Sequence, residues 1–378
     1  MTVLFVPKET AAGEQRVSIV PETVSRITKC GITVLVEKGA GELSYYTDQE
    51  YVSAGAKLAE SRDAGLSTAD IVTVVQPLTS NDVGKLRPGT IVIGFQAPTR
   101  NREGIIAMKE RSITSFALEL LPRITRAQSM DALSSQSTVG GYKAVLIAAD
   151  NCPRLLPMLT TAAGTIRPAN VLVLGAGVAG LMAIATARRL GAVVSAYDVR
   201  RAAGEQVRSL GAKFLELQID AEAAGGYARE LTPEEKEKEQ AMVNEAVAQA
   251  DAVITTANVP GRRAPLLIRK EMVEKMKPGS VIVDLAAESG GNCELTQPGN
   301  KIVYKGVTII GPLNLPGQVP YHASQMYSRN LYAFLELLIS KEGNIVSNFE
   351  DEILRSSMLT YGGEIRHQQT KELLEVKQ

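Results

Sequence analysis

Three glycines and one aspartate form the pattern with the clearest chemical meaning in this sequence. Gly175, Gly177 and Gly180 follow one another at the G-x-G-x-x-G spacing, and Asp198 ends the next apolar run. In such a pattern the first glycine permits a tight turn, the second lets a pyrophosphate approach the backbone, and the third lets a helix pack closely. An acidic residue at about this distance accepts hydrogen bonds from ribose hydroxyls. The pattern therefore predicts a dinucleotide site.

The segments that flank these glycines have the order that a dinucleotide-binding strand–helix–strand unit requires. The helix would begin at the glycines, so that its N–H groups and the positive end of its dipole face a diphosphate. A glycine-containing turn without a ligand is the simpler alternative, but the complete order of elements argues against it. The predicted elements are a strand at Val171–Leu174, a helix at Leu181–Leu190 and a strand at Val193–Tyr197.

The residues after the second strand bear on the choice of cofactor. The carboxylate of Asp198 would repel a 2′-phosphate, which favours NAD(H) over NADP(H). Arg200 and Arg201 follow closely and could bind such a phosphate, so NADP(H) stays an alternative at this point.

The composition is typical of a soluble protein with more than one domain. The 378 residues suffice for two domains, and 45% of them are hydrophobic. The 41 basic and 41 acidic residues cancel and there is no Trp, so nothing favours nucleic-acid binding. Cys30, Cys152 and Cys293 form no C-x-x-C pair, so we expect no metal site and a reducing, cytoplasmic location. We expect neither a signal peptide nor a membrane span, because no apolar run reaches about 18 residues.

Short apolar runs alternate with helical segments, which predicts an α/β fold with two doubly wound, Rossmann-like parallel-sheet domains and an interdomain cleft. A predicted helix at Gln318–Ile339 should return to the first domain. We therefore expect a discontinuous N-terminal domain of residues 1–132 plus 318–378, and an NAD(H)-binding domain of residues 133–317. The other predicted elements are the strands Val3–Val6, Thr33–Val36, Ile71–Val75, Thr90–Phe95, Ser112–Phe116, Lys213–Leu217, Ala252–Thr255 and Val281–Leu285, the hairpin-like pair Ile302–Tyr304 and Thr308–Ile310, and the helices Pro21–Lys29 and Arg102–Arg111.

One long helix is predicted to connect the two domains. Ser129 is expected as its N-cap, with Asp131 in the first turn, and the helix should reach about Asp150. Gly140 and Gly141 interrupt the pattern and are expected at a point of close packing.

An unusual insertion spans residues 220–239. It contains Gly225, Gly226 and Tyr227 and continues as a charged helix. Long connections of this kind are often lids or binding loops, and a solvated loop is the alternative.

Side chains that exchange protons near neutral pH are scarce. Most nicotinamide dehydrogenases move a hydride and a proton together and need an acid–base group. The chain has two histidines, His322 and His367, which are far in sequence from the glycines and are expected at the surface or at helix ends.

A different polar set precedes the long helix. Its members include Arg123, Gln128, Asp131 and Ser134. Guanidinium and amide groups orient a ligand well but transfer protons poorly, although a solvated loop before a helix explains the spacing equally well. The combination favours a hydride transfer without proton exchange, such as transfer between two nicotinamide rings that the protein aligns.

Several segments give the sequence a specific resemblance to a known family. From about Val3 to Leu337 the chain resembles the NAD(H)-binding component, domain I or alpha-1 subunit, of proton-translocating NAD(P) transhydrogenase. Alanine dehydrogenase and saccharopine dehydrogenase have a similar fold. The segments are PRITRAQSMDALSSQS, TAAGT, GAGVAGLMAIATARRLGA, AGGYA, ITTANVPG, MKPGSVIVDLA and GGNCELT.

The resemblance implies an enzyme that transfers a hydride directly between NAD(H) on this chain and NADP(H) on a partner subunit. In the complete bacterial enzyme this exchange is coupled to proton translocation by membrane-embedded subunits. The resemblance also implies a homodimer, peripherally associated with the inner membrane through those partners.

Residue roles follow from the same resemblance. Gln128 matches a residue that reaches toward the NADP(H) partner, and Tyr227 matches the tyrosine of a loop that closes over NAD(H). The catalytic residues it implies are Arg123, Gln128, Asp131, Ser134 and Tyr227. The cofactor-binding residues it implies are Arg123, Gly175, Gly177, Val178, Gly180, Asp198, Val199, Arg200, Gly226 and Ala257.

An NAD-dependent amino-acid dehydrogenase of the alanine type is the competing function. Lys8 and Arg16 fit both families. Alanine dehydrogenase uses a lysine where this chain offers Val74 or Gln76, a histidine where it has Gln96, and an aspartate where it has Glu288. Groups that would handle a keto acid and ammonia are thus absent, apart from Arg16. Transhydrogenases often keep that lysine and histidine too, and this chain has neither. We interpret both positions as dispensable for transfer between two nicotinamides, and a specialised subgroup is the alternative. A non-catalytic NAD(H) sensor is a further alternative.

Overall fold

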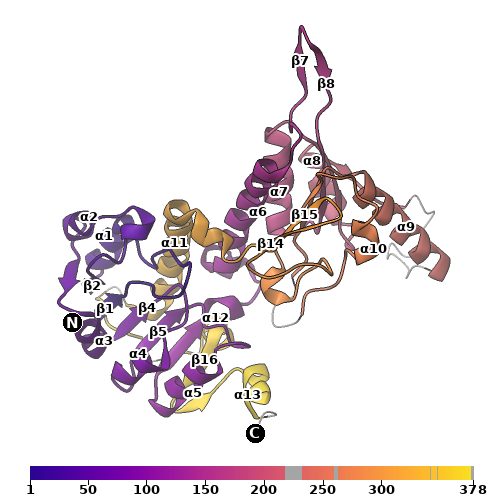
Figure 1. The fold of residues 1–378 in the computed structure, drawn as a ribbon. Coiled ribbons are helices and arrows are strands. Elements are labelled where there is room, and N and C mark those ends of the chain that lie inside the picture. The colour runs from indigo at the N-terminus through magenta and orange to yellow at the C-terminus, as the bar shows by residue number, and fades with distance from the viewer. Residues whose placement is uncertain (218–231, 259–262, 341, 347, 376–378) are drawn as a thin grey trace. The chain divides into compact units, whose positions relative to one another are not determined.

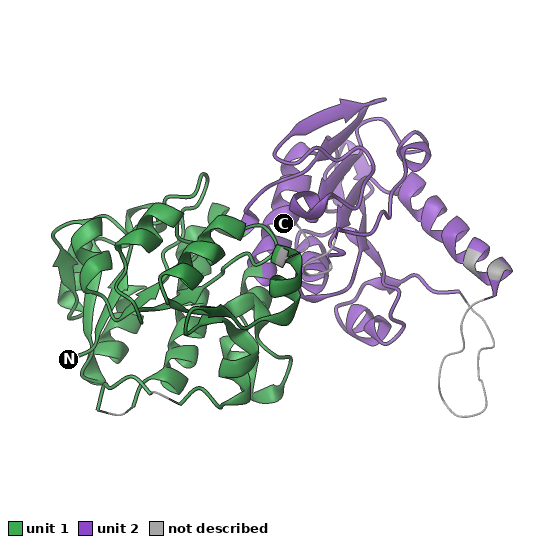
Figure 2. Cartoon of the chain, turned by 90° about the horizontal axis from the view of Figure 1, so that it is seen from below, with its two compact units in different colours: residues 1–136, 316–378 green, residues 137–315 purple. Residues whose placement is uncertain are grey.

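The computed structural model describes residues 1–217, 232–258, 263–340, 342–346 and 348–375. The chain divides into two compact units, and each is considered by itself (Figure 2). Unit 1 comprises Met1–Gln136 and Pro316–Gln378, and unit 2 comprises Ser137–Leu315. The C-terminal segment of the chain therefore returns to the unit that the N-terminus begins. None of the described helices has the length and hydropathy needed to cross a bilayer.

Unit 1 is built on an eight-stranded sheet with the order β17-β16-β6-β5-β4-β1-β2-β3 (Figure 1). The neighbouring strands β3, β2, β1, β4, β5 and β6 are all parallel. The β16 strand pairs antiparallel with both β6 and β17. Their bounds are β1 Val3–Val6, β2 Thr33–Glu37, β3 Lys57–Ala59, β4 Ile71–Thr73, β5 Ile91–Gly94, β6 Thr114–Ala117, β16 Met358–Tyr361 and β17 Glu364–Ile365.

Helices cover both faces of this sheet. Alternate residues of a strand point to opposite faces, so each strand contributes to two cores. In β1, Leu4 and Val6 belong to one hydrophobic core and Phe5 to another. The helices of unit 1 are α1 Pro21–Lys29, α2 Asp48–Ser53, α3 Arg62–Thr68, α4 Ser80–Lys85, α5 Arg102–Glu110, α11 Pro320–Leu338, α12 Glu352–Ser357 and α13 Gln368–Glu375, with 3-10 turns at η1 Glu42–Ser44, η2 Leu118–Leu120 and η3 Thr125–Met130.

Unit 2 contains a seven-stranded sheet with the order β11-β10-β9-β12-β13-β15-β14. It is parallel except for the β14–β15 hairpin, which confirms the hairpin predicted there. A separate two-stranded ribbon, β7 with β8, projects from the rest of the unit (Figure 1). The bounds are β7 Leu159–Thr161, β8 Gly164–Ile166, β9 Asn170–Leu174, β10 Val193–Tyr197, β11 Lys213–Phe214, β12 Ala252–Thr255, β13 Val281–Asp284, β14 Lys301–Tyr304 and β15 Val307–Ile310.

The second sheet also has helices on both faces. In β9, Val171 and Val173 share a core with Ala183 of α7, whereas Leu172 shares another core with Val247 of α9. The remaining elements are α6 Ala132–Asn151, α7 Val178–Arg189, α8 Ala203–Ser209, α9 Pro233–Gln249, α10 Lys270–Val273, η4 Ala287–Ser289 and η5 Leu315–Gln318. The two sheets confirm the predicted doubly wound α/β class.

Some predicted bounds were wrong. The α6 helix does not have Ser129 as its N-cap, because Thr125–Met130 form a 3-10 turn and Asp131 accepts the N–H of Ser134 instead. The β6 strand begins at Thr114 rather than Ser112, because Ser112 adopts a left-handed φ of 54° in the preceding turn. The short strands β3, β7, β8, β16 and β17 were not predicted.

The expected packing point in α6 is confirmed. A Cβ added to Gly141 would lie 2.1 Å from the carbonyl oxygen of Ala179, which belongs to the first turn of α7. The same addition at Gly140 would meet atoms no closer than 4.0 Å. Gly141 is thus the glycine that lets α6 approach α7.

Candidate dinucleotide site

The glycine turn lies between β9 and α7 in unit 2. Gly175 has a left-handed φ of 101°, and a Cβ there would lie 2.6 Å from the Thr256 hydroxyl oxygen. A Cβ on Gly180 would lie 1.9 Å from the carbonyl oxygen of Gly175. Gly177 differs, because a Cβ there would meet no atom of the described residues within 4 Å. Packing therefore requires Gly175 and Gly180, whereas Gly177 leaves space in front of the helix.

The N-terminus of α7 opens onto that space. Gly177 is the N-cap residue and has no side chain to cap the helix, and Val178 begins the first turn. The first N–H groups of an α-helix have no partner within the helix. They form a ready site for an anionic group such as a diphosphate.

Asp198 follows β10 and connects this strand to the glycine turn. Its Oδ2 accepts the N–H of Ala176 at 2.7 Å, and its Oδ1 accepts the N–H and the Nε–H of Arg200 at 2.8 and 2.9 Å. Burial disfavours the charged carboxylate, but the hydrogen bonds from Arg200 and from the two backbone N–H groups outweigh it and lower the pKa of Asp198. The carboxylate is therefore ionised and placed beside the turn.

The other predicted cofactor residues of unit 2 lie at the same edge of the sheet or outside the described residues. Val199 and Arg200 directly follow Asp198 and are exposed. Ala257 follows the end of β12, the neighbour of β9 on its other side. Gly226 and Tyr227 lie outside the described residues, as does most of the insertion, of which α9 covers the charged end.

The predicted polar set belongs to unit 1. Arg123 and Gln128 are exposed, and neither side chain has a hydrogen-bond partner among the described residues. Asp131 accepts from the N–H and the hydroxyl of Ser134 at 2.8 and 2.6 Å, so these two form a pair at the start of α6. Arg126 instead pairs with Asp351, the N-cap residue of α12.

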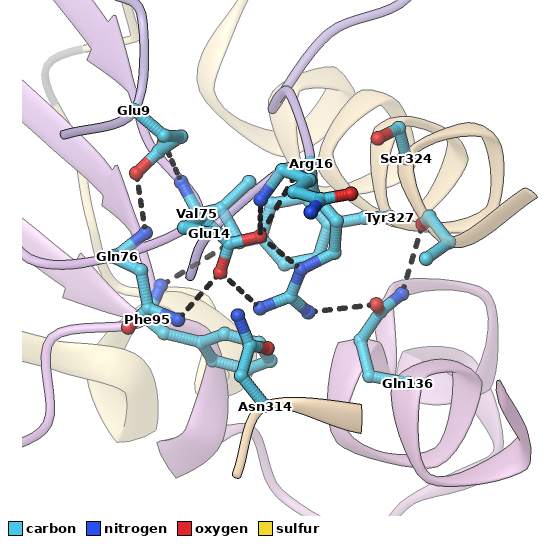
Figure 3. A network of polar contacts seen from close by, with 12 residues as sticks. Glu9, Glu14, Arg16, Val75, Gln76, Phe95, Gln136, Asn314, Ser324 and Tyr327 are labelled. Carbon is cyan, nitrogen blue, oxygen red and sulfur yellow. Dashed lines mark hydrogen bonds and ion pairs between the residues drawn. The ribbon is translucent and has the colours of Figure 1, made fainter. Parts of the chain in front are cut away.

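A buried ion pair joins Arg16 and Glu14 of unit 1 (Figure 3). The guanidinium group of Arg16, a residue that is 4% exposed, donates two hydrogen bonds to the carboxylate of Glu14 at 2.8 and 2.6 Å and one to Gln136 at 2.8 Å. Gln76 donates to the same carboxylate at 2.8 Å. Burial opposes ionisation of Glu14, yet Arg16 lowers its pKa. The charges of Arg16 and Glu14 are thus paired with each other inside the protein.

The two histidines are remote from these groups along the chain and have the environments predicted for them. His322 is exposed near the start of α11, where its ring packs edge-on against Tyr321. His367 precedes α13 and its Nδ1 lies 2.8 Å from the hydroxyl of Thr370, and burial lowers its pKa. Neither has a hydrogen bond to a predicted site residue among the described contacts.

The sequence pattern missed three residues that belong to, or hold, the segment after β12, which lies beside the glycine turn. Thr256 donates its hydroxyl to the carbonyl of Gly175 at 3.0 Å. Asn292 hydrogen-bonds both backbone groups of Ala257, and Asp284 holds the segment that carries Asn292. A buried acid at the end of a strand, followed by a Gly-Gly-Asn turn, was the available signal.

The fold, together with the glycine turn after β9 and the residues that follow β10 and β12, defines a class of protein: a two-unit, Rossmann-like dinucleotide-binding protein. Family models agree with that class. The model described as "Alanine dehydrogenase/PNT, N-terminal domain" matches residues 5–140, and "Alanine dehydrogenase/PNT, C-terminal domain" matches residues 144–368.

Individual relatives place the chain within the family. It is 47% identical over 374 residues to the first of the alpha-subunit polypeptides of NAD(P) transhydrogenase from Rhodospirillum rubrum, covering 96% of this chain and 97% of the relative. A transhydrogenase structure from Sinorhizobium meliloti superimposes with a TM-score of 0.88 at 46% identity, covering 96% and 99% of the two chains. Alanine dehydrogenase of Mycobacterium tuberculosis is 32% identical over 296 residues, covering 78% and 74%. The chain therefore belongs to the alanine dehydrogenase/PNT family, as an enzyme of its transhydrogenase branch.

Proposed function

We propose that this chain binds NAD(H) and exchanges a hydride with NADP(H) held on a partner subunit. The carrying observation is the glycine turn, where Gly177 leaves open space before α7 and the ionised Asp198 stands beside the turn. In this proposal the N–H groups of α7 bind the diphosphate, and Asp198, Val199 and Arg200 hold the adenosine ribose. The carboxylate favours NAD(H), because its charge repels a 2′-phosphate.

Hydride transfer between two nicotinamide rings needs alignment rather than a proton shuttle. We assign nicotinamide contacts to Arg123, Gln128, Asp131 and Ser134, with Gln128 directed toward the NADP(H) partner. The Asp131–Ser134 pair fixes the start of α6, and the exposed Arg123 and Gln128 side chains are available for a ligand. Gly226, Ala257 and Tyr227 complete the proposed site.

The buried pair in unit 1 argues against the amino-acid dehydrogenase. A keto-acid carboxylate would need a free cation, but the guanidinium of Arg16 is already bound to Glu14 and Gln136. Gln76 is bound to Glu14, and Gln96 is fully buried and cannot act as an acid or base. Purified chain given NAD⁺ and alanine should form no NADH, and turnover would favour the alternative.

The decisive assay mixes the chain with an NADP(H)-binding partner domain and follows reduction of an NAD analogue by NADPH. We expect transfer with the native chain, and its absence would favour an NAD(H) sensor.

Gln128→Ala should slow transfer at least about tenfold while NADH binding persists, because the amide acts on ring approach rather than on affinity. Ser129→Ala, an exposed neighbour on the same 3-10 turn, is the matched control. Equal loss of transfer and binding in Gln128→Ala would remove Gln128 from the catalytic group.

We also propose that the chain forms a homodimer through the β7–β8 ribbon. All residues of both strands are exposed, and Met158 and Ile166 are 65% and 50% exposed. An isolated two-stranded hairpin is marginally stable in water, so a second copy that covers these side chains would stabilise it. Membrane-embedded partner subunits would then hold the dimer at the cytoplasmic face of the inner membrane.

A further inference from the structure

The Gly-Gly-Asn turn after β13 carries a network of buried polar groups that the proposed hydride transfer does not by itself explain. Asp284 and Asn292 are both 0% exposed. Burying a carboxylate and an amide is costly unless every polar atom is bonded, and apolar residues of similar size would usually serve a core as well. The contacts of these two residues show what the network holds in place.

Asp284 is the last residue of β13 and accepts hydrogen bonds from two directions. Its Oδ1 accepts the hydroxyl of Thr255, the last residue of β12, at 2.9 Å. Its Oδ2 accepts the N–H of Asn292 at 2.7 Å and the hydroxyl of Thr296 at 2.6 Å. The carboxylate therefore ties the end of β12 to the turn that carries Asn292.

Asn292 in turn holds the chain directly after β12. Its Oδ1 accepts the N–H of Ala257 at 3.1 Å, and its Nδ2 donates to the carbonyl oxygens of Ala257 and Pro265, both at 2.8 Å. Ala257 lies beyond the end of β12, where no neighbouring strand among the described residues bonds its backbone. The side-chain amide of Asn292 forms these backbone hydrogen bonds instead. The preceding residue, Thr256, contacts the glycine turn through the carbonyl of Gly175.

The sheet order tells which half of a dinucleotide this segment would meet. The β9 strand has β10 on one side and β12 on the other, so the connections reverse there. A dinucleotide lies across such a reversal. With Asp198 at the end of β10 assigned to the adenosine ribose, the nicotinamide half extends over the end of β12, where Ala257 lies.

We infer that Asn292, held by Asp284, is a positioning residue that fixes the Thr256–Ala257 segment as the wall for the nicotinamide half of the bound NAD(H). This inference rests on the proposed NAD(H) function. It makes a prediction that a purely structural role does not share, because only one half of the ligand meets this wall.

The test compares two ligands by titration calorimetry: NADH, and ADP, which has the adenosine and diphosphate but no nicotinamide. Asn292→Ala should weaken NADH binding about tenfold, which corresponds to about 1.4 kcal/mol, and should change ADP binding less than about twofold. The matched control is Ser280→Ala, which removes a buried hydroxyl bonded to the carbonyl of Ala250 at the opposite end of β13. Ser280→Ala should leave both affinities unchanged.

Equal weakening of NADH and ADP by Asn292→Ala, or no weakening of either, would overturn the inference. If Asn292→Ala does not fold, Thr296→Val removes one hydrogen bond from Asp284 with little change of shape and should show the same selectivity to a smaller extent. Loss of that selectivity in the folded Thr296→Val protein would also overturn it. A native chain that binds neither NADH nor ADP would instead refute the proposed function itself.

Discussion

Two acidic residues show how local surroundings set charge in this protein. Asp198 is surrounded by donors, and despite burial these lower its pKa. Glu9 lies near the end of β1, where its carboxyl group accepts the N–H groups of Val75 and Gln76 at 2.6 and 3.1 Å. Burial of that carboxyl group dominates and raises its pKa to about 8, with a smaller contribution from the charge of Glu14. The first acid is suited to ligand binding, and the second stays protonated near neutral pH.

Replacement of Asp198 tests the ribose assignment. Asp198→Ala should weaken NADH binding by about 1–3 kcal/mol, because ribose hydroxyls and the N–H of Ala176 lose their acceptor. Calorimetric titration measures the change. Asp150→Ala, which removes an exposed acid from α6, is the control and should bind NADH normally. An Asp198→Ala protein with native affinity would contradict the assignment.

Glu9 should make stability depend on pH. Its folded-state pKa of about 8 lies above the ordinary value of 4.5, so the folded protein holds a proton that the unfolded chain releases between these values. This contribution is fully present below about pH 4.5 and is lost as the pH rises toward about 8. Melting temperatures at pH 5 and pH 8 should differ less in Glu9→Gln than in the native chain. An unchanged difference would show that Glu9 does not titrate in this range.

At the scale of elements, close contacts rather than propensities decide how α6 and α7 pack beside β9. The α7 helix starts against the carbonyl of Gly175, and α6 approaches its first turn through Gly141. Gly140, one residue away, faces much more open surroundings. Two adjacent glycines therefore serve different purposes in the same helix.

The adjacent pair allows an internal comparison. Gly141→Ala should destabilise the protein by about 1–3 kcal/mol, because the new methyl group would collide with the carbonyl of Ala179. Gly140→Ala should be neutral or stabilising by up to about 1 kcal/mol, since alanine favours helix and the added Cβ makes ordinary contacts. Thermal unfolding of both variants measures the effects. Similar melting temperatures for the two would mean that α6 does not pack against α7 as described.

At the scale of the whole molecule, the β7–β8 ribbon is notable because contacts within one chain bury none of the residues of its two strands. Leu159, Ile166 and the neighbouring Met158 are exposed apolar side chains. Association of two copies would remove this apolar surface from water.

A charge on the ribbon should therefore shift the oligomeric state. Ile166→Lys should produce monomers at concentrations where the native chain is dimeric, because a lysine cannot be buried in an apolar contact at low cost. Sedimentation velocity gives the populations. Val303→Lys places the same charge on an exposed site of β14 and should leave the dimer intact. A dimer that persists in Ile166→Lys would place the interface elsewhere.

The sequence alone determined the features whose residues are neighbours along the chain. The β9–α7–β10 unit, its glycines and the terminal Asp198 could be predicted because turn geometry and helix and strand periods are local properties. The same holds for the α/β class and for the ends of α1 and β12, which match the prediction. The N-cap of α6 could not be fixed in this way, because Ser129 and Asp131 compete for it and η3 decides the outcome.

Only the tertiary structure decided which distant side chains meet. Arg16 donates a hydrogen bond to Gln136, 120 residues away, in addition to its ion pair with Glu14. Asn292 reaches Ala257 only because β12 and β13 pair in parallel and their ends share one edge. Spacing does not encode such contacts, since they depend on how loops close and strands order, and the network behind the glycine turn became visible only in the folded chain.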